Sequence, residues 1–304
     1  MSRIPGWNLT CPDCEPRPTR LFAFPHRSSA AGANGRYPLT PHNHLQIIAH
    51  LRQEIEPALA QAVVETVVLR QKAAVKFSRA AQMYFTREAL EQASAEPVAQ
   101  YRAARFAGAG LETVADLGCG IGGDALALTQ NLEVVGIDLD EMRLRLAREN
   151  VRVYEGSGCS HPLQADIQTL PPLPVAGVFL IRRGGMSRAG AFIWWPITAA
   201  FVGGGEVARE GAGTAVKISP GVRYEEIPAD AEVEFISLNG EVKEGVLWFD
   251  ELRTGAARRA TLLPGGHSLV NRPGLEIPLS EPLAYLYEPD GGGHPRPSGA
   301  RAGR

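Results

Sequence analysis

Apolar residues recur at three- and four-residue steps over residues 45–69, which is the period of an α-helix that buries one face. Pro57 interrupts this run, because a proline inside a helix lacks the N–H group that the helix needs. Further helices are predicted over residues 73–83, 86–93 and 97–107. Thr86 is expected to cap the middle one, since its hydroxyl can accept from a free N–H of the first turn. We predict that residues 45–110 form a helical cap on the domain that follows.

Downstream, short apolar runs alternate with amphipathic segments, which is typical of a parallel sheet with helices on both faces. The predicted strands cover residues 113–117, 133–138, 163–165, 175–181 and 214–218, and the predicted helices cover residues 123–130 and 141–151. Two alternating runs on either side of Asn239-Gly240 predict a β-hairpin over 233–238 and 242–249. The predicted fold class is therefore α/β, a doubly wound, Rossmann-like sheet with an antiparallel hairpin end, preceded by the helical cap.

The two ends of the chain lack such a pattern. Residues 1–44 are rich in proline and small residues and predict a poorly ordered leader, whereas residues 291–304 predict a disordered tail. Short strands and Pro/Gly turns over residues 256–290 predict a small appendage. The α/β domain is expected to occupy residues 111–255.

Composition excludes several classes of protein. The 304 residues are 44% hydrophobic and 21% charged, as in ordinary globular proteins. A formal net charge of -2 argues against a broad basic face, so any nucleic-acid contact would depend on a local patch. We expect a cytoplasmic protein without a membrane segment, since no apolar run reaches the roughly 18 residues that span a bilayer. No metal is expected, because Cys11 and Cys14 lack a second ligand pair at zinc spacing.

A buried strand followed by a glycine loop and a helix is predicted from residues 114–124, which read Val-Ala-Asp-Leu-Gly-Cys-Gly-Ile-Gly-Gly-Asp. The spacing that ends at Gly123 fits a dinucleotide site, whereas the spacing Gly118-x-Gly-x-Gly122 fits S-adenosylmethionine (SAM), so the glycines alone leave both open. Asp116 favours SAM. Its carboxylate would repel a pyrophosphate and attract the ammonium group of a methionine moiety.

Two acids stand at predicted strand ends. Asp138 lies twenty positions after Gly118, where an acid can accept hydrogen bonds from both ribose hydroxyls. The alternative is an exposed acid that caps the next helix, a role that Asp140 fits better. Asp166 is placed to accept from an adenine amino group, with Ile167 against the ring, although a solvated loop acid would have the same sequence signal.

Cys119 lies between two glycines of the loop and near a helix N-terminus, which could favour a thiolate nucleophile. The sequence shows no paired base for it. We therefore expect a small apolar filler and assign no catalytic residue.

Residues 116–128, residues 135–150 and Ala165-Asp166 together resemble class I SAM-dependent methyltransferases. Residues 76–77, 83–94, 217–221, 241–249 and 286–290 extend this resemblance to the bacterial methyltransferases that carry a THUMP-like C-terminal domain. Phe85-Thr86-Arg87-Glu88 is also similar to the cofactor-proximal segment of trimethylguanosine-synthase-like enzymes, which implies that Thr86 lies near the methionine end of SAM.

The resemblance implies SAM as cofactor, RNA as substrate and a base nitrogen as methyl acceptor. With the glycine loop and the two acids, the expected cofactor-binding residues are Asp116, Gly118, Cys119, Gly120, Gly122, Asp138, Leu139, Asp166, Ile167 and Thr86.

Two segments depart from the family pattern. After Leu180 the family has an Asp-Pro-Ala-Arg-like acceptor motif, but this chain continues through Arg182-Arg183 into the glycine-rich residues 184–213. The two arginines could meet phosphates or form a solvated basic pair. After Asp290 the THUMP-like domain is replaced by a Gly/Pro/Arg-rich ending. Reading-frame errors and true divergence both remain open, as does an alternative function as a SAM-binding scaffold without catalysis.

Overall fold

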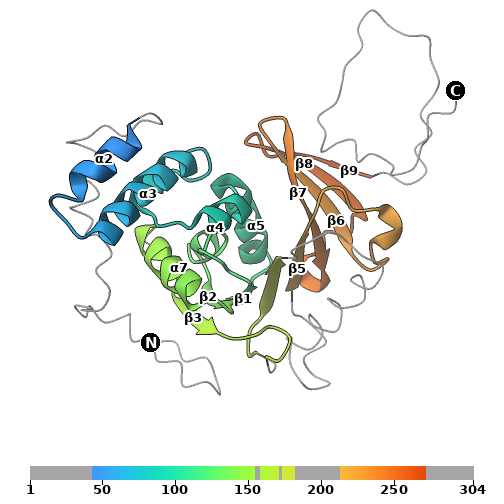
Figure 1. Cartoon of the computed structure of the whole chain (residues 1–304). Helices are drawn as coiled ribbons and strands as arrows, with labels where there is room; N and C mark the ends of the chain where they lie inside the picture. The colour runs from blue at the N-terminus through green and yellow to red at the C-terminus, as the bar shows by residue number, and fades with distance from the viewer. Residues whose placement is uncertain (1–42, 155–157, 171–172, 182–212, 272–304) are drawn as a thin grey trace, which may run out of the picture. The chain divides into compact units, whose positions relative to one another are not determined.

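The computed structural model describes residues 43–154, 158–170, 173–181 and 213–271 (Figure 1). Residues 1–42 of the expected leader, which include Cys11 and Cys14, the expected tail, and residues 182–212 lie outside these residues, whereas His44 already belongs to a helix. The chain divides into two compact units. Unit 1 comprises Met1–Glu96 and Cys119–Gln164, and unit 2 comprises Pro97–Gly118 and Ala165–Arg304.

Unit 1 contains helices and a pair of strands. Its elements are α2 (His44–Leu51), α3 (Pro57–Ala73), the 3-10 helix η2 (Ala80–Gln82), α4 (Arg87–Gln92), α6 (Ala125–Leu128), β2 (Glu133–Asp138), α7 (Glu141–Tyr154) and β3 (Ser160–Gln164). Strands β2 and β3 are parallel, and Asp138 pairs with Gln164 at their ends. Helix α7 packs on both strands (Figure 1) because its buried face is apolar, with Leu144, Leu146 and Val153 among the buried residues.

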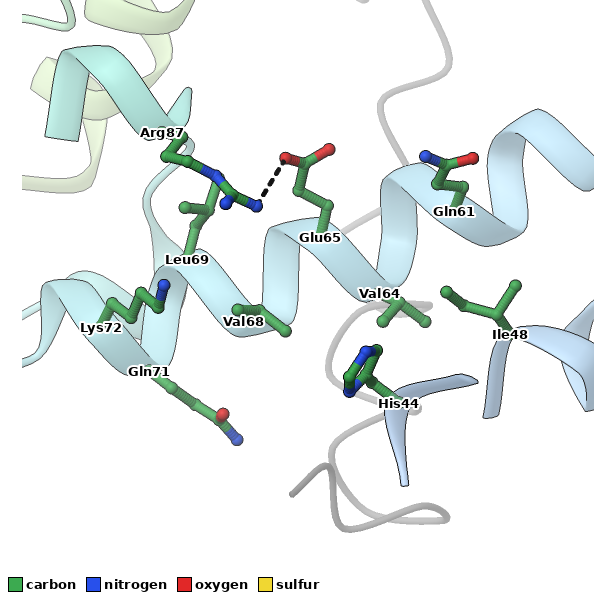
Figure 2. A pocket seen from close by; sticks show the side chains of 10 residues that line it. All are labelled: His44, Ile48, Gln61, Val64, Glu65, Val68, Leu69, Gln71, Lys72 and Arg87. Atoms are coloured by element: carbon green, nitrogen blue, oxygen red, sulfur yellow. Dashed lines mark ion pairs between the residues drawn. The ribbon is translucent and has the colours of Figure 1, made fainter. Parts of the chain in front are cut away.

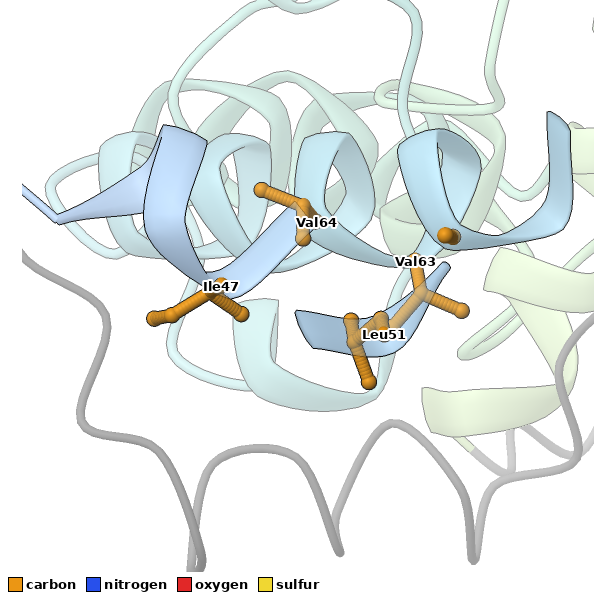
Figure 3. Packing of buried hydrophobic residues seen from close by; sticks show 5 residues of the cluster. Ile47, Leu51, Val63 and Val64 are labelled. Atoms are coloured by element: carbon orange, nitrogen blue, oxygen red, sulfur yellow. The ribbon is translucent and has the colours of Figure 1, made fainter. Parts of the chain in front are cut away.

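The helical period predicted over residues 45–69 is present as α2 and α3. The break falls at Pro57, which becomes the first residue of α3, where its missing N–H costs nothing. The Glu56 carboxylate caps this helix by accepting from the Leu59 N–H at 3.1 Å. Apolar side chains of the two helices pack together (Figure 3), with Ile47 and Leu51 on α2 against the valines of α3.

The prediction of a helix over residues 73–83 is wrong. Helix α3 ends at Ala73, and turns and the short η2 follow. The Ser78 N–H donates to the Glu96 carboxylate at 2.6 Å, so a side chain takes the place of a helical carbonyl there. The Lys76 ammonium donates to three carbonyl oxygens at the end of α4 and just beyond it, which fixes the turn. Helix α6 is also shorter than predicted, and α7 is longer.

Unit 2 contains most of one helix and seven strands among its described residues. Its elements are α5 (Glu96–Gly108, of which Glu96 belongs to unit 1), β1 (Thr113–Leu117), β4 (Gly177–Ile181), β5 (Gly213–Ile218), the 3-10 helix η4 (Tyr224–Glu226), β6 (Glu232–Leu238), β7 (Glu241–Phe249), the 3-10 helix η5 (Asp250–Leu252), β8 (Arg258–Leu263) and β9 (His267–Val270). The strands lie in the order β1-β4-β5-β7-β6-β8-β9. The first three are parallel, and β7 pairs antiparallel with both β5 and β6.

The predicted hairpin is confirmed as β6 and β7. Asn239 and Gly240 have φ values of 54° and 83°, the left-handed pair that a two-residue hairpin turn needs. In the described part of the expected appendage, strands β8 and β9 are present, and β8 extends the sheet by pairing parallel with β6. The α/β, Rossmann-like fold class with an antiparallel end is therefore confirmed.

Strand β6 carries a buried charge network that the sequence pattern did not reveal. Glu232 and Glu234 are fully buried. Arg105 of α5 contacts Glu232 at 2.8 Å and Glu234 at 3.0 Å. Trp248 Nε1 and the Tyr101 hydroxyl also donate to Glu234. Every one of these contacts lies within unit 2, and together they compensate the two buried carboxylates.

Candidate cofactor site

The glycine loop of unit 1 is held by main-chain hydrogen bonds at the end of β2. The Cys119 N–H donates to the Ile137 carbonyl oxygen at 2.9 Å, and the Gly120 N–H donates to Asp138 Oδ2 at 3.0 Å. Gly122 has a φ of 79°, and a Cβ there would lie 3.1 Å from Ala147 of α7. Only glycine combines that backbone conformation with such close packing against the helix.

The Asp138 carboxylate stands between this loop and the start of α7. It is 8% exposed, and its second oxygen accepts from the Asp140 N–H at 3.0 Å. A carboxylate offers about four acceptor positions, so two stay available for hydroxyl donors. The cap of α7 is Asp140, whose Oδ1 accepts from the N–H groups of Met142 and Arg143. The helix-capping alternative for Asp138 is therefore ruled out by the contacts themselves.

Two large apolar side chains close to Asp138 in the sequence are exposed. Leu139 is 67% exposed and Met142 is 47% exposed. The Leu139 carbonyl oxygen is fixed by the Gln164 amide at 3.1 Å. These two side chains offer a surface on which a flat apolar ring could lie.

Cys119 packs as a small apolar side chain. It is buried with Leu144 and Ala147 of α7. A Cβ on Gly136 of β2 would lie 3.4 Å from its sulfur, so the strand residue beneath it has to be small. This packing agrees with the filler interpretation.

A segment before the glycine loop lies against it within unit 1. Thr86 caps α4 by accepting from the Ala89 N–H at 3.2 Å, as predicted. Two residues earlier, Tyr84 is bound through both of its main-chain polar groups to the side chain of Asn150. The same amide donates to the Ile121 carbonyl oxygen at 3.0 Å. Sequence reasoning missed Asn150, although a polar residue on the apolar face of a predicted helix was an available signal.

Four of the expected residues belong to unit 2. Asp116 is fully buried on β1, where it pairs with Phe179 of β4, and Gly118 has a φ of 82°. Asp166 is exposed and accepts from the Gln168 N–H at 2.9 Å, which forms a local turn. Ile167 beside it is half-buried. Unit 1 by itself brings together Cys119 and the glycines after it, Asp138 and Leu139.

A separate pocket of about 620 Å³ lies over α2, α3 and α4 of unit 1 (Figure 2). Its walls include Ile48 and Val68, and at one side Arg87 forms an ion pair with Glu65 at 4.0 Å. None of the expected cofactor-binding residues lines it. Across the described parts of the chain, no group of three His, Cys, Asp or Glu side chains could hold a metal ion. Nor does any helix described there have the length and apolar character to cross a membrane.

The chain has recognisable relatives. Residues 114–181 match the family model described as a methyltransferase domain. The chain is 32% identical over 246 residues to proteins named as uncharacterized S-adenosylmethionine-dependent methyltransferases, MT3122 and Rv3037c, from two strains of Mycobacterium tuberculosis. The match includes 75% of this chain and 65% of each relative, so the chain spans just under two thirds of their length.

The fold has a counterpart among solved structures. A crystal structure of a protein from Porphyromonas gingivalis W83, provisionally described as a methyltransferase, superposes with a TM-score of 0.51 at 17% identity. The superposition covers 71% of this chain and 60% of that one. Residues 114–181 therefore match a methyltransferase domain, and the superposition supports the Rossmann-like α/β fold.

Proposed function

We propose that this chain is a SAM-dependent methyltransferase that acts on RNA in the cytoplasm, with a base nitrogen as acceptor. The observation that carries the proposal is the junction of Gly120 and Asp138 at the end of β2. A glycine loop bonded to a buried acid with spare acceptor positions fits an adenosine ribose.

The geometry of the loop favours SAM over a dinucleotide. A pyrophosphate needs the N-terminus of a substantial helix, but α6 has only four residues. The carboxylate of Asp116, two residues before Gly118, would repel a second anion and suit the ammonium group of the methionine moiety. The residues present thus fit SAM.

Each expected residue has a proposed role. Asp138 accepts from the ribose hydroxyls. Ile167 and Leu139 lie against the adenine ring, whose amino group donates to Asp166. Thr86 and the loop from Gly118 to Gly122 hold the methionine end. When bound, SAM supplies a methyl group on a positively charged sulfur, a good leaving group. These residues contribute by orienting that methyl group for in-line attack by the acceptor nitrogen.

The RNA substrate rests on resemblance alone. Residues 83–94 and 241–249 resemble methyltransferases with a THUMP-like domain, and residues 85–88 resemble trimethylguanosine-synthase-like enzymes. A net charge of -2 requires that RNA contact be local rather than spread over a basic face.

Two measurements test the proposal. Calorimetric titration with SAM, S-adenosylhomocysteine and NADH should show binding of the first two only, and NADH binding without SAM binding would overturn the assignment. Transfer of labelled methyl from SAM to total cellular RNA should then be observed. Binding of SAM without any labelled RNA would reject RNA as substrate and favour the scaffold alternative.

A further inference from the structure

The side chain of Asn150 on α7 is fully buried. Its amide group makes three hydrogen bonds, all of them to main-chain atoms. Its Oδ1 accepts from the Tyr84 N–H at 2.7 Å, and its Nδ2 donates to the Tyr84 carbonyl oxygen at 2.9 Å. Its other amide hydrogen reaches the Ile121 carbonyl oxygen inside the glycine loop at 3.0 Å. One planar amide therefore fixes the separation between two segments that are distant in sequence.

The contact continues further along the same two segments. The Ser94 hydroxyl donates to Asp124 Oδ2 at 3.3 Å, at the end of the glycine loop. A Cβ on Gly123 would lie 3.4 Å from the Ala93 Cβ, so the two chains approach closely there. The segment from Tyr84 to Ser94 thus follows the loop from Ile121 to Asp124, all within unit 1.

We propose that Asn150 is a positioning residue for the cofactor. It sets the main chain of Tyr84 against the glycine loop, so that the segment ending at Thr86 forms a wall at the methionine end of the site. The inference rests on the proposed function. It also places part of the site upstream of residues 114–181, the range that the methyltransferase family model matches.

The alternative is that Asn150 only stabilises the fold, and a pair of ligands separates the two roles. S-adenosylhomocysteine has both an adenosine and an amino-acid end, whereas 5′-methylthioadenosine lacks the amino-acid end. If Asn150 positions the methionine end of the site, its removal should weaken binding of S-adenosylhomocysteine and leave binding of 5′-methylthioadenosine unchanged. If Asn150 only stabilises the fold, its removal should weaken binding of both ligands equally.

The variants are Asn150→Ser and, as matched control, Tyr154→Phe on the same helix. The Tyr154 hydroxyl donates to Glu96 at 2.9 Å and accepts from the Arg79 N–H at 3.4 Å, so it also ties α7 to an upstream segment, away from the glycine loop. Calorimetry on the full chain should show about tenfold weaker S-adenosylhomocysteine binding for Asn150→Ser, with 5′-methylthioadenosine within about twofold of the unsubstituted chain. Tyr154→Phe should leave both affinities unchanged.

Equal losses for both ligands, or unchanged affinities with a lowered melting temperature, would overturn the positioning role. An unsubstituted chain that binds neither ligand would instead overturn the proposed function itself. If Asn150→Ser does not fold, hydrogen exchange on the unsubstituted chain decides. S-adenosylhomocysteine should slow exchange of the Tyr84 amide together with that of Gly120 but leave that of Arg79 unchanged. An unaffected Tyr84 amide would overturn the inference.

Discussion

The Gly120 N–H donates to Asp138 Oδ2 at 3.0 Å, so the glycine loop and the acid that ends β2 are joined by a hydrogen bond. This contact orients the carboxylate while leaving acceptor positions for a ligand. Because the Asp140 N–H binds the other oxygen, both oxygens are fixed before any ligand arrives. A preorganised carboxylate spares the entropy cost of ordering it on binding.

Replacing Asp138 with Asn tests this contact. The variant keeps the shape of the side chain but loses the charge and one acceptor oxygen, and a charge-assisted hydrogen bond contributes about 1.5–3 kcal/mol. SAM affinity measured by calorimetry should fall by at least about tenfold. Asp140→Ala is the control, because it removes the α7 cap and an ion pair with Arg143 but leaves the Asp138 side chain in place: it should lower stability by about 1 kcal/mol and leave SAM affinity unchanged. Equal SAM affinity in Asp138→Asn would contradict the ribose assignment.

Gly122→Ala should destabilise unit 1 by about 1–3 kcal/mol, because the added methyl meets Ala147 at 3.1 Å on a backbone with φ 79°. Gly110→Ala is the matched control, since Gly110 has a similar φ of 74° with open space around it. Urea denaturation of both variants isolates the packing effect. Equal losses of stability would show that backbone strain alone requires glycine at position 122.

Arg105→Met should destabilise unit 2 by about 3–5 kcal/mol, because Glu232 and Glu234 would each lose a charged partner while staying buried. The comparison is Lys243→Met, which removes a more exposed ion pair with Glu241 and should change stability by less than about 1 kcal/mol. Denaturant melts of the two variants check the difference. Similar small effects of the two variants would contradict the stabilising role of Arg105.

Acid should weaken unit 2 through Glu232. Burial acts to raise its pKa, but hydrogen bonds from the Thr254 N–H and from Arg105 together hold the pKa below its ordinary value. A depressed folded-state pKa contributes stability above the unfolded-state pKa of about 4.3, and this stability is lost as the pH falls through the lower folded-state pKa. Melting temperatures across that window should fall more steeply for the unsubstituted chain than for Glu232→Gln. An equal fall of the melting temperature with pH in both proteins would contradict this role of Glu232.

The sequence predicts the parts of this structure that depend on local chemistry. Asn239-Gly240 predicted the hairpin because only a few residues adopt left-handed backbone. The position of Asp138 at the end of β2 agrees with its spacing to Gly118, since the short helix α6 and strand β2 fill the interval.

The features that sequence reasoning missed depend on which distant segments pack together. Glu234 alternates with apolar residues, so its burial could be predicted only by knowing that Arg105 of α5 reaches it. Asn150 similarly reads as one polar residue in an amphipathic helix until Tyr84 and Ile121 are placed beside it. Long-range polar contacts leave no periodic signal in a single chain.

We propose that the glycine loop and Asp138, the last residue of β2, form the SAM site of this chain. Irradiation of the full chain with methyl-labelled SAM, followed by peptide mapping, tests it most directly. The label should be found in the peptides that cover residues 83–94 and 114–142, and excess S-adenosylhomocysteine should abolish it. Labelling confined to the pocket between α2 and α3, or labelling that S-adenosylhomocysteine does not suppress, would contradict the claim.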